Sequence, residues 1–285
     1  MNASSLQPAW ITGAGGLIGS HLVQTASPEA ARWRVIALAH PQLDLTDFAA
    51  VRDRFRQERP RLIIHCAALS KSPACQQNPP LARKLNVEVP AHLADLAVNI
   101  SFIFFSSDLV FDGRQGNYDE SAAPNPLSVY AETKVEAERI VLANPRHTVV
   151  RVSLNFGASP TGDRSFAEEM RRAWEAGQTL KLFTDEFRSP IPAAVTARAV
   201  WELAARNQPG LYHLAGAERL SRWEIGQVLA AHWPNLSARM EASSLREYHG
   251  APRPPDTSLN CAKIQKMLSA PLPRFSEWLR ENPAA

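Results

Sequence analysis

The feature that most constrains the fold is a glycine-rich segment near the start of the chain. Residues 13–19, GAGGLIG, place glycines in a G-x-x-G-x-x-G spacing between a short apolar run at 8–12 and a helical pattern at 16–26. Such glycines allow a tight turn and let a phosphate approach the backbone, while the helix start offers free N–H groups and a partial positive charge. A turn needed only for packing is the alternative. The position of the glycine-rich segment between a strand and a helix favours a dinucleotide-binding loop.

Short apolar runs alternate with helical periodicity along the chain. Strands are expected at 8–12, 34–39, 61–66, 101–106, 147–152, 180–183 and 210–215, and helices at 16–26, 48–57, 80–98, 129–142, 166–176, 193–207 and 223–233. The run 101–106, SFIFFS, is typical of a parallel strand that is buried on both faces. This rhythm predicts an α/β protein with a doubly wound parallel sheet of the Rossmann type.

The second half of the chain is less regular than the first. The segment 189–192 is SPIP, and the tail from Ala251 holds five prolines before Phe275, so we expect this tail to be mostly loop. We therefore predict an NAD(P)-binding Rossmann domain over 1–152. Residues 153–285 are expected to form mainly a smaller substrate-binding lobe, with segments that return to the first domain.

Composition excludes several classes of protein. The 285 residues are 45% hydrophobic with a net charge of +3 and no block of lysine and arginine, which disfavours disorder and a nucleic-acid partner. Three cysteines without C-x-x-C spacing fit a reducing cytoplasm and suggest no zinc site. The first dozen residues do not resemble a signal peptide, and no apolar run approaches the roughly 18 residues of a membrane span. We expect a soluble cytoplasmic protein without a metal or a membrane partner.

The end of the second expected strand bears on the choice of cofactor. An NAD-binding site usually has an acidic residue there for the ribose hydroxyls, but this chain has Leu38-Ala39-His40. We therefore expect NADP(H) to be preferred, with NAD(H) possible. His40 is a candidate for the 2′-phosphate, although an ordinary exposed loop histidine is an equal alternative. Asp44, Leu45 and Asp47 are expected near the adenine, and a helix cap is the alternative role of Asp47.

A tyrosine and a lysine four residues apart form the candidate catalytic pair. Tyr130 and Lys134 share one face of the expected helix. A nearby ammonium favours the phenolate and lowers the pKa of a tyrosine, so such a pair can exchange a proton with a carbonyl substrate. Ser107 follows the apolar strand and lies 23 residues before Tyr130. Its hydroxyl is expected to face the crevice in which α/β folds bind ligands, unless it only caps a turn.

Taken together, six motifs resemble those of the extended short-chain dehydrogenases. They are GAGGLIG at 13–19, DLTD at 44–47, HCAA at 65–68, SSDLVFDG at 106–113, YAETK at 130–134 and RVSLNFG at 151–157. Within that family the chain is most similar to the dTDP-4-dehydrorhamnose reductase (RmlD-like) group. The segment 185–191, DEFRSPI, resembles the D-Q-x-G-x-P-T of this group. The segments 210–214 and 253–260 match its C-terminal pattern, so the resemblance covers nearly the whole chain.

The resemblance implies roles for individual residues. Ser107, Tyr130 and Lys134 would form the catalytic set. The cofactor would be bound by Gly13, Gly15, Gly16, Leu17, Ile18, Gly19, Cys66, Ala67, Ala68, Tyr130, Lys134 and Ser153. The substrate would meet Ser70, Ser107, Asn155, Arg188 and Arg253. The two arginines are candidates for a diphosphate because their forks match phosphate oxygens, and a structural role is the alternative.

Several positions depart from the pattern of the group. Residues 70–76 lack the two acids of T-x-V-D-x-x-E, Leu154 and Asn155 replace its usual aromatic segment, and Leu109 replaces a tyrosine. These positions lie on the expected substrate side, so the identity of the sugar stays open. Dehydratases of the superfamily carry Thr-Asp-Glu where this chain has Ser107-Asp108-Leu109, which argues against an elimination reaction.

The leading hypothesis is an NADP(H)-dependent reductase of a 4-keto nucleotide sugar, such as a dTDP-4-dehydro-6-deoxyhexose. Hydride would reach C4, and Tyr130 would donate the proton. One alternative is a nucleotide-sugar epimerase or another dehydrogenase of this fold. The other is a non-catalytic, NADP-binding regulatory subunit, because the β subunit of methionine adenosyltransferase resembles the same group. A homodimer is possible.

Overall fold

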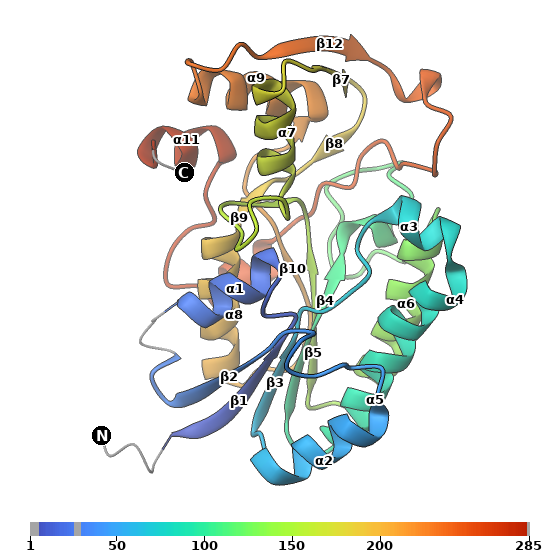
Figure 1. Ribbon diagram of the computed structural model, residues 1–285, viewed down its shortest axis with the longest axis vertical. Helices are drawn as coiled ribbons and strands as arrows, with labels where there is room; N and C mark the ends of the chain where they lie inside the picture. The colour runs from blue at the N-terminus through green and yellow to red at the C-terminus, as the bar shows by residue number, and fades with distance from the viewer. Residues whose placement is uncertain (1–5, 26–29, 284–285) are drawn as a thin grey trace.

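A six-stranded parallel sheet forms the centre of the molecule (Figure 1). The computed structural model describes residues 6–25 and 30–283. The strands lie in the order β10-β5-β4-β3-β1-β2. Their bounds are β1 Gln7–Thr12, β2 Trp33–Leu38, β3 Leu62–His65, β4 Ser101–Ser107, β5 His147–Val152 and β10 Gly210–Leu214. The predicted doubly wound parallel sheet is thus confirmed.

The strand order places a ligand crevice beside β1. This strand pairs with β2 on one side and with β3 on the other, and Thr12 is level with both Leu38 and His65. The connections from β1 and β3 therefore leave in opposite directions across the sheet. Open α/β sheets bind ligands at such a switch point, outside the carboxyl ends of the strands. The glycine-rich segment follows β1 at this edge.

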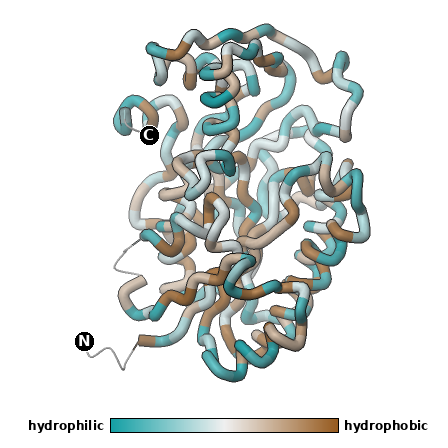
Figure 2. The backbone as a smooth tube through the Cα atoms, in the orientation of Figure 1, coloured by the Kyte–Doolittle hydropathy of each residue, from teal (hydrophilic) through white to brown (hydrophobic). Residues whose placement is uncertain are grey.

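Helices cover both faces of the sheet (Figure 1). On one face lie α1 (Leu17–Gln24) and α8 (Ala193–Arg206), and on the other lie α2 (Phe48–Glu58), α5 (Val89–Leu96) and α6 (Val129–Leu142). Alternate strand residues point to opposite faces. Ile64, Ile103 and Phe105 belong to the first core, and Ile63, Phe102 and Phe104 belong to the second. Figure 2 shows the hydrophobic residues gathered along these inner strands.

The helix expected over 80–98 is interrupted by a π-helical turn. The structure has α3 (Ser72–Gln77), α4 (Pro79–Arg83), a π-helical turn at Lys84–Glu88 and then α5. Pro90 explains the interruption because it has no N–H and its ring would clash with the carbonyl four residues earlier, at Asn86. The backbone bond from Val89 to Lys84 spans five residues instead of four. The side chain of Asn86 is thereby turned inward and is 1% exposed.

A second, smaller lobe lies above the carboxyl edge of the sheet (Figure 1). Its main elements are α7 (Phe166–Glu175), β7 (Thr179–Phe183), α9 (Arg222–His232), β12 (Arg239–Ser243) and α11 (Phe275–Glu281). They enclose a separate core that includes Trp174, Ile225 and Phe275. The parallel pairing of β7 with β12 was not predicted, because the five residues of β12, RMEAS, are mostly polar and form no apolar run.

Short pairings connect the lobe with the sheet. Antiparallel β8 (Phe187–Arg188) and β11 (Leu220–Ser221) form one pair, and parallel β6 (Asn155–Phe156) and β9 (Ile191–Pro192) form another. The tail, expected to be mostly loop, contains α10 (Ala262–Gln265) and α11. Before α10 the chain runs back beside the sheet, where Tyr118 N–H donates to the Ser258 carbonyl and Asn260 N–H to the Tyr118 carbonyl. This return brings the 253–258 segment to the carboxyl edge of the sheet.

Two expectations reach beyond the described residues. The helix expected at 16–26 is α1, and Ala26 lies outside them, as do the first five residues of the segment tested for a signal peptide. Over residues 6–25 and 30–283, no helix has both the length and the apolar character needed to cross a membrane.

Candidate active site

The glycine-rich loop has little room for side chains. Gly13 has φ +67°, and a Cβ on it would lie 2.6 Å from the backbone nitrogen of Ala67. A Cβ on Gly19 would lie 2.2 Å from the carbonyl oxygen of Gly13. Gly16 is the N-cap of α1 and no side chain caps this helix, so its first N–H groups face the loop. Leu17 and Ile18 pack into the core behind the turn, whereas Gly15 makes only an ordinary contact with Ala39.

Residues 66–68 meet this loop from the end of β3. Cys66 N–H donates to the carbonyl of Thr12 at 3.2 Å, and Ala67 is the residue that approaches Gly13. Burial raises the pKa of the Cys66 thiol, so it stays protonated and behaves as an apolar wall. Ala68 is partly exposed beside it. The structure thus brings the predicted loop and the predicted alanine run together at the carboxyl edge of the sheet, where open α/β sheets bind ligands.

The segment after β2 presents polar groups to solvent. His40 is exposed. Asp44 accepts hydrogen bonds from the backbone and hydroxyl of Thr46 at 2.9 and 2.8 Å, and these bonds lower the pKa of its carboxyl. Leu45 is half-buried against the core beneath α2. Asp47 caps α2 by accepting from Ala50 N–H, so the helix-cap expectation is confirmed. The only carboxylates between β2 and α2 are therefore held in local turns.

Ser107, Tyr130 and Lys134 lie together where the carboxyl end of β4 meets the first turns of α6. Ser107 ends β4 and is 7% exposed, while Tyr130 and Lys134 are 7% and 3% exposed. Ser128 caps α6 through Ala131 N–H, which fixes where this helix begins. The Lys134 Nζ donates to the Phe105 carbonyl at 2.9 Å and lies 6.0 Å from the Tyr130 ring centroid. The three predicted catalytic residues thus share one buried cluster.

Burial shifts the two proton-handling groups in opposite directions. It lowers the pKa of Lys134 to about 8, and the carboxylate of Glu138 opposes this effect. It raises the pKa of Tyr130, while the hydrogen bond with Ser107 and the charge of Arg188 oppose that rise. The sequence-based expectation that Lys134 depresses the pKa of Tyr130 is not what the structure shows, because desolvation of the phenolate dominates. The phenol therefore holds its proton at neutral pH.

Two functional positions escaped the sequence analysis. Asn86 accepts from Leu69 N–H at 2.9 Å and donates to the Leu69 carbonyl and to the Thr133 hydroxyl, so it ties the loop after β3 to α6. Asp108 is fully buried and accepts from Ser107, Ser153 and Arg188, among others. A carboxylate directly after a buried apolar strand was the available signal for Asp108. Asn86 had none, since its position depends on the π-helical turn.

The predicted substrate residues fall into two groups. Asn155 follows β5 and bonds the Ser153 carbonyl and the Thr196 hydroxyl. Ser153, which was predicted to contact the cofactor, donates to Asp108 at 2.7 Å. Ser70 is exposed on the loop before α3. Arg188 and Arg253 line a small cavity of about 50 Å³ together with Ser72, Leu109, Glu186 and Tyr248. The structure therefore brings both arginines beside Leu109, next to the catalytic serine.

Both arginines are already engaged by carboxylates. Arg188 forms a bidentate pair with Asp108 at 2.7 and 2.5 Å and is 6% exposed. Arg253 forms one with Glu186 at 2.8 and 2.9 Å, but a third of its side chain reaches solvent. Of the two, Arg253 has the larger exposed part with which to meet a diphosphate.

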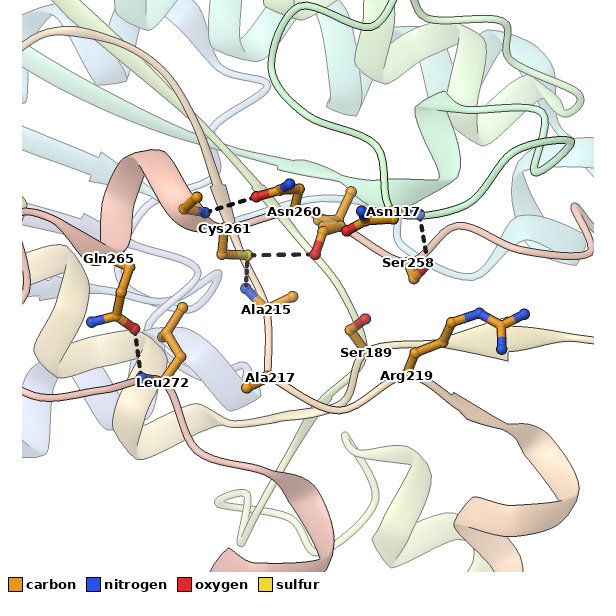
Figure 3. A pocket seen from close by; sticks show the side chains of 13 residues that line it. Asn117, Ser189, Ala215, Ala217, Arg219, Ser258, Asn260, Cys261, Gln265 and Leu272 are labelled. Atoms are coloured by element: carbon orange, nitrogen blue, oxygen red, sulfur yellow. Dashed lines mark hydrogen bonds between the residues drawn. The ribbon is translucent and has the colours of Figure 1, made fainter.

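A larger cavity of about 390 Å³ lies at the outer edge of the sheet, beyond β10. Figure 3 shows Ser189, Asn117 and Asn260 around it, with Arg219 at its rim. Cys261 borders it and accepts from Ala215 N–H. None of the catalytic, cofactor or substrate residues predicted from the sequence lines this cavity. The predicted catalytic residues lie instead in the cluster around Ser107.

Comparison with known proteins finds relatives that are similar to this chain over nearly its whole length. The chain is 29% identical to the methionine adenosyltransferase 2 subunit beta of Xenopus laevis, over 96% of this chain and 86% of the relative. It is also 29% identical to the probable low-salt glycan biosynthesis reductase Agl14 of Haloferax volcanii, over 97% of both chains. The crystal structure of dTDP-4-dehydrorhamnose reductase from Bacillus anthracis in complex with NADP shares the fold, with a TM-score of 0.89 at 24% identity over 97% of this chain and 98% of that one.

A family model gives the assignment. The model described as RmlD substrate binding domain matches residues 9–283. This match spans both lobes and includes every predicted site residue. The chain therefore belongs to the RmlD substrate binding domain family, and the resemblance found in its motifs is confirmed.

Proposed function

We propose that this protein is an NADPH-dependent reductase of a keto group on a nucleotide sugar, with C4 of a 4-keto-6-deoxyhexose as the reacting carbon. The observation that carries the proposal is the buried cluster of Ser107, Tyr130 and Lys134 beside the glycine-rich crevice. A reductase of a carbonyl needs one proton donor next to a dinucleotide site, and the cluster supplies it. The family assignment and the reductase names among the relatives support this function.

The residues present fit a dinucleotide in the crevice. The absence of side chains at Gly13 and Gly19 leaves backbone and the open start of α1 for a pyrophosphate. Lys134, whose Nζ has one backbone acceptor, has N–H groups left for the ribose hydroxyls. When bound, the nicotinamide supplies the hydride.

The proton step is assigned to Tyr130. As negative charge develops on the carbonyl oxygen, the phenol donates its proton to that oxygen, and Ser107 lies within hydrogen-bonding reach of the phenol. Lys134 carries positive charge under the tyrosine, which stabilises the phenolate that remains. The proton step is not assigned to Asp108, because its oxygens are occupied by two arginine N–H groups and three hydroxyls.

The end of β2 favours NADPH over NADH. The carboxylates of Asp44 and Asp47 accept hydrogen bonds from their own turns, so they are not directed to ribose hydroxyls. Exposed His40 adds a donor for a 2′-phosphate. The related reductase from Bacillus anthracis was crystallised with NADP, and the more distant MoeE5 with NAD. We therefore expect NADPH to bind more tightly, with NADH as a weaker cofactor.

The decisive assay follows NADPH oxidation at 340 nm with a panel of 4-keto-6-deoxy nucleotide sugars, dTDP- and UDP-linked, each made freshly by a dehydratase. Substrate-dependent oxidation with formation of the 4-hydroxy sugar supports the proposal. No oxidation of NADPH or NADH with any member of the panel, from protein that binds cofactor, would count decisively against it. Isomerised sugar without net oxidation, with retained NAD⁺ or NADP⁺, would indicate an epimerase.

A non-catalytic subunit is the second candidate, because the chain is similar over nearly its whole length to the methionine adenosyltransferase 2 subunit beta. That function predicts cofactor binding without turnover and a stable complex with a catalytic partner. Affinity purification from the native cell extract at physiological salt, followed by mass spectrometry and an assay of methionine adenosyltransferase activity, separates it from the reductase.

A further inference from the structure

A fully buried carboxylate lies directly after the catalytic serine. Asp108 is 0% exposed. Its Oδ1 accepts from Arg188 Nη2 at 2.5 Å and from Ser107 Oγ at 3.2 Å. Its Oδ2 accepts from Arg188 Nε at 2.7 Å, Ser153 Oγ at 2.7 Å and Thr257 Oγ1 at 3.2 Å. These donors come from both lobes, so Asp108 is the point at which the lobes meet next to the reacting groups.

Arg188 is the counterion of this carboxylate. Its Nε and Nη2 both donate to Asp108, and its third nitrogen, Nη1, lies 3.9 Å from Glu186 Oε1. Its side chain is 8% exposed. It also occupies the position of the glycine in the D-Q-x-G-x-P-T pattern that DEFRSPI resembles. Its guanidinium is therefore neutralised from two sides and differs from Arg253, whose side chain is 34% exposed.

The carboxylate also decides how the serine hydroxyl is turned. A hydroxyl has one proton and two lone pairs. The proton of Ser107 points to Asp108, and one lone pair accepts from Leu109 N–H at 3.2 Å. Ser107 also acts on the Tyr130 phenol, because its hydrogen bonding opposes the rise in the pKa of Tyr130. Asp108 thus fixes the rotation of the serine hydroxyl beside the tyrosine.

We propose that Asp108 and Arg188 form a positioning pair, in which Arg188 neutralises Asp108 so that Asp108 can fix the rotation of the Ser107 hydroxyl beside Tyr130, and that Arg188 is not a ligand of the substrate diphosphate. This inference rests on the proposed function only in that Ser107 and Tyr130 act on the carbonyl. It departs from the view of Arg188 as a candidate diphosphate ligand and takes the structural role that was the alternative for this residue.

The buried pair makes a specific prediction for a double-mutant cycle. Removing one partner leaves a buried charge uncompensated, whereas removing both leaves none. We expect Arg188→Met and Asp108→Asn each to lower kcat by at least about 10-fold with KM changed by no more than about threefold. The double variant D108N/R188M should recover kcat to within about threefold of the wild type. A diphosphate ligand predicts the opposite split, with KM raised in R188M and no recovery in the double variant.

Arg219→Met is the matched control. Arg219 also forms an ion pair with an aspartate, Asp256, at 2.7 Å, but it is half-exposed and lies outside the cluster. Its loss should leave kcat and KM unchanged. A kcat loss in R219M equal to that in R188M would show that any change of an inter-lobe arginine disturbs the site, and the specific proposal would fall.

Binding of dTDP and UDP, measured by calorimetry, tests the pair without turnover. We expect R188M to keep the wild-type affinity for both within about threefold, and Arg253→Met to weaken it by about tenfold or more. If R188M loses binding as R253M does, Arg188 is a diphosphate ligand and the proposal is wrong. If the wild type reduces no nucleotide sugar, the proposed function fails separately. The pair is then judged by thermal unfolding, where D108N/R188M should be more stable than R188M.

Discussion

At the scale of single residues, the site is defined by how burial acts on two polar side chains. Desolvation disfavours the charged form of each titratable group. The phenol of Tyr130 therefore keeps its proton, while the ammonium of Lys134 is brought close to its titration point at about pH 8. A protonated tyrosine over a lysine is the state that a ketone reductase needs before the reaction. The neighbouring Ser107, Asp108 and Arg188 adjust this state through hydrogen bonds and charge.

Tyr130→Phe tests the proton donor. The substitution removes only the hydroxyl, so packing and the position of Lys134 are retained. We expect kcat to fall by about 100-fold or more, the scale of general acid catalysis, with NADPH affinity nearly unchanged. Steady-state kinetics and NADPH fluorescence titration measure the two quantities. Tyr212→Phe is the control, because Tyr212 bonds the Gln208 carbonyl away from the site. Near-normal kcat in Y130F would refute the assignment.

The pH dependence of kcat/KM tests Lys134. The ammonium is present below its pKa of about 8 and is lost as the pH rises, so activity should fall on the alkaline side with a midpoint near pH 8. The carboxylate of Glu138 raises this pKa, so Glu138→Gln should move the alkaline limb to lower pH. Gln can still accept from Arg151, which now pairs with Glu138.

Glu202→Gln is the control for this shift. Glu202 is also a buried carboxylate, 4% exposed, but it bonds Ser269 on the far side of α8. Its loss should leave the midpoint of the alkaline limb in place even if stability falls. A limb that stays fixed in E138Q would mean that a group other than Lys134 titrates there.

At the scale of elements, the ends of strands and helices decide where these residues lie. Ser128 starts α6 two residues before Tyr130, and β4 ends at Ser107. Pro90 breaks the α-helical pattern at Asn86, which then fixes the loop after β3 against α6. The glycine loop works through the open N-terminus of α1. Each of these devices depends on one residue type at one position, which makes them testable by single substitutions.

Gly13→Ala tests the tight approach of the loop to β3. Gly13 and Gly162 have nearly the same positive φ, +67° and +68°, but a Cβ on Gly162 would meet nothing within 4 Å. Gly162→Ala should therefore cost only the strain of this conformation, about 1 kcal/mol. Gly13→Ala adds the clash with Ala67, so we expect a larger loss of stability and loss of NADPH binding. Chemical denaturation and fluorescence titration compare them, and equal effects would contradict the close approach.

At the scale of the whole molecule, buried polar networks join the lobe to the sheet. Asp108 and Thr257 are 149 positions apart and share a hydrogen bond. His213 on β10 is fully buried, pairs with the Tyr118 carbonyl at 2.9 Å and lies 3.3 Å from Arg151, which is itself bonded to Glu138 on α6. The helix that carries Tyr130 and Lys134 is thus connected through β5 to the edge of the sheet. The lobe and the sheet are expected to unfold together because the Asp108 network joins them.

Acid stability tests the His213 network. Burial and the charge of Arg151 lower the pKa of His213 to about 4, below its ordinary value of 6.5. The unfolded chain therefore binds a proton between these pH values that the folded chain does not, so stability is present above pH 6.5 and is lost as the pH falls toward 4. His213→Gln should reduce this slope by up to about 1.4 kcal/mol per pH unit.

Urea unfolding at a series of pH values measures this slope. His249→Gln, at an exposed position, is the control and should leave it unchanged. H213Q should also lower stability at neutral pH by about 1–3 kcal/mol, because a buried hydrogen-bonding group is altered. An unchanged slope in H213Q would show that His213 is not among the groups that take up protons on acid unfolding.

The sequence by itself determined the parallel sheet, the glycine loop and the Ser107–Tyr130–Lys134 set. Those features depend on neighbours within about one element, such as apolar runs like SFIFFS, G-x-x-G-x-x-G spacing, and the four-residue spacing of a helix face. Only the tertiary structure decided that β12 pairs with β7, that Asn86 turns inward, and that Arg188 neutralises Asp108. Asp108 and Arg188 are 80 positions apart in the sequence. Which carboxylate pairs with Arg188 depends on which one is buried beside it. Local patterns carry no information on that burial, because it arises when distant segments exclude water together.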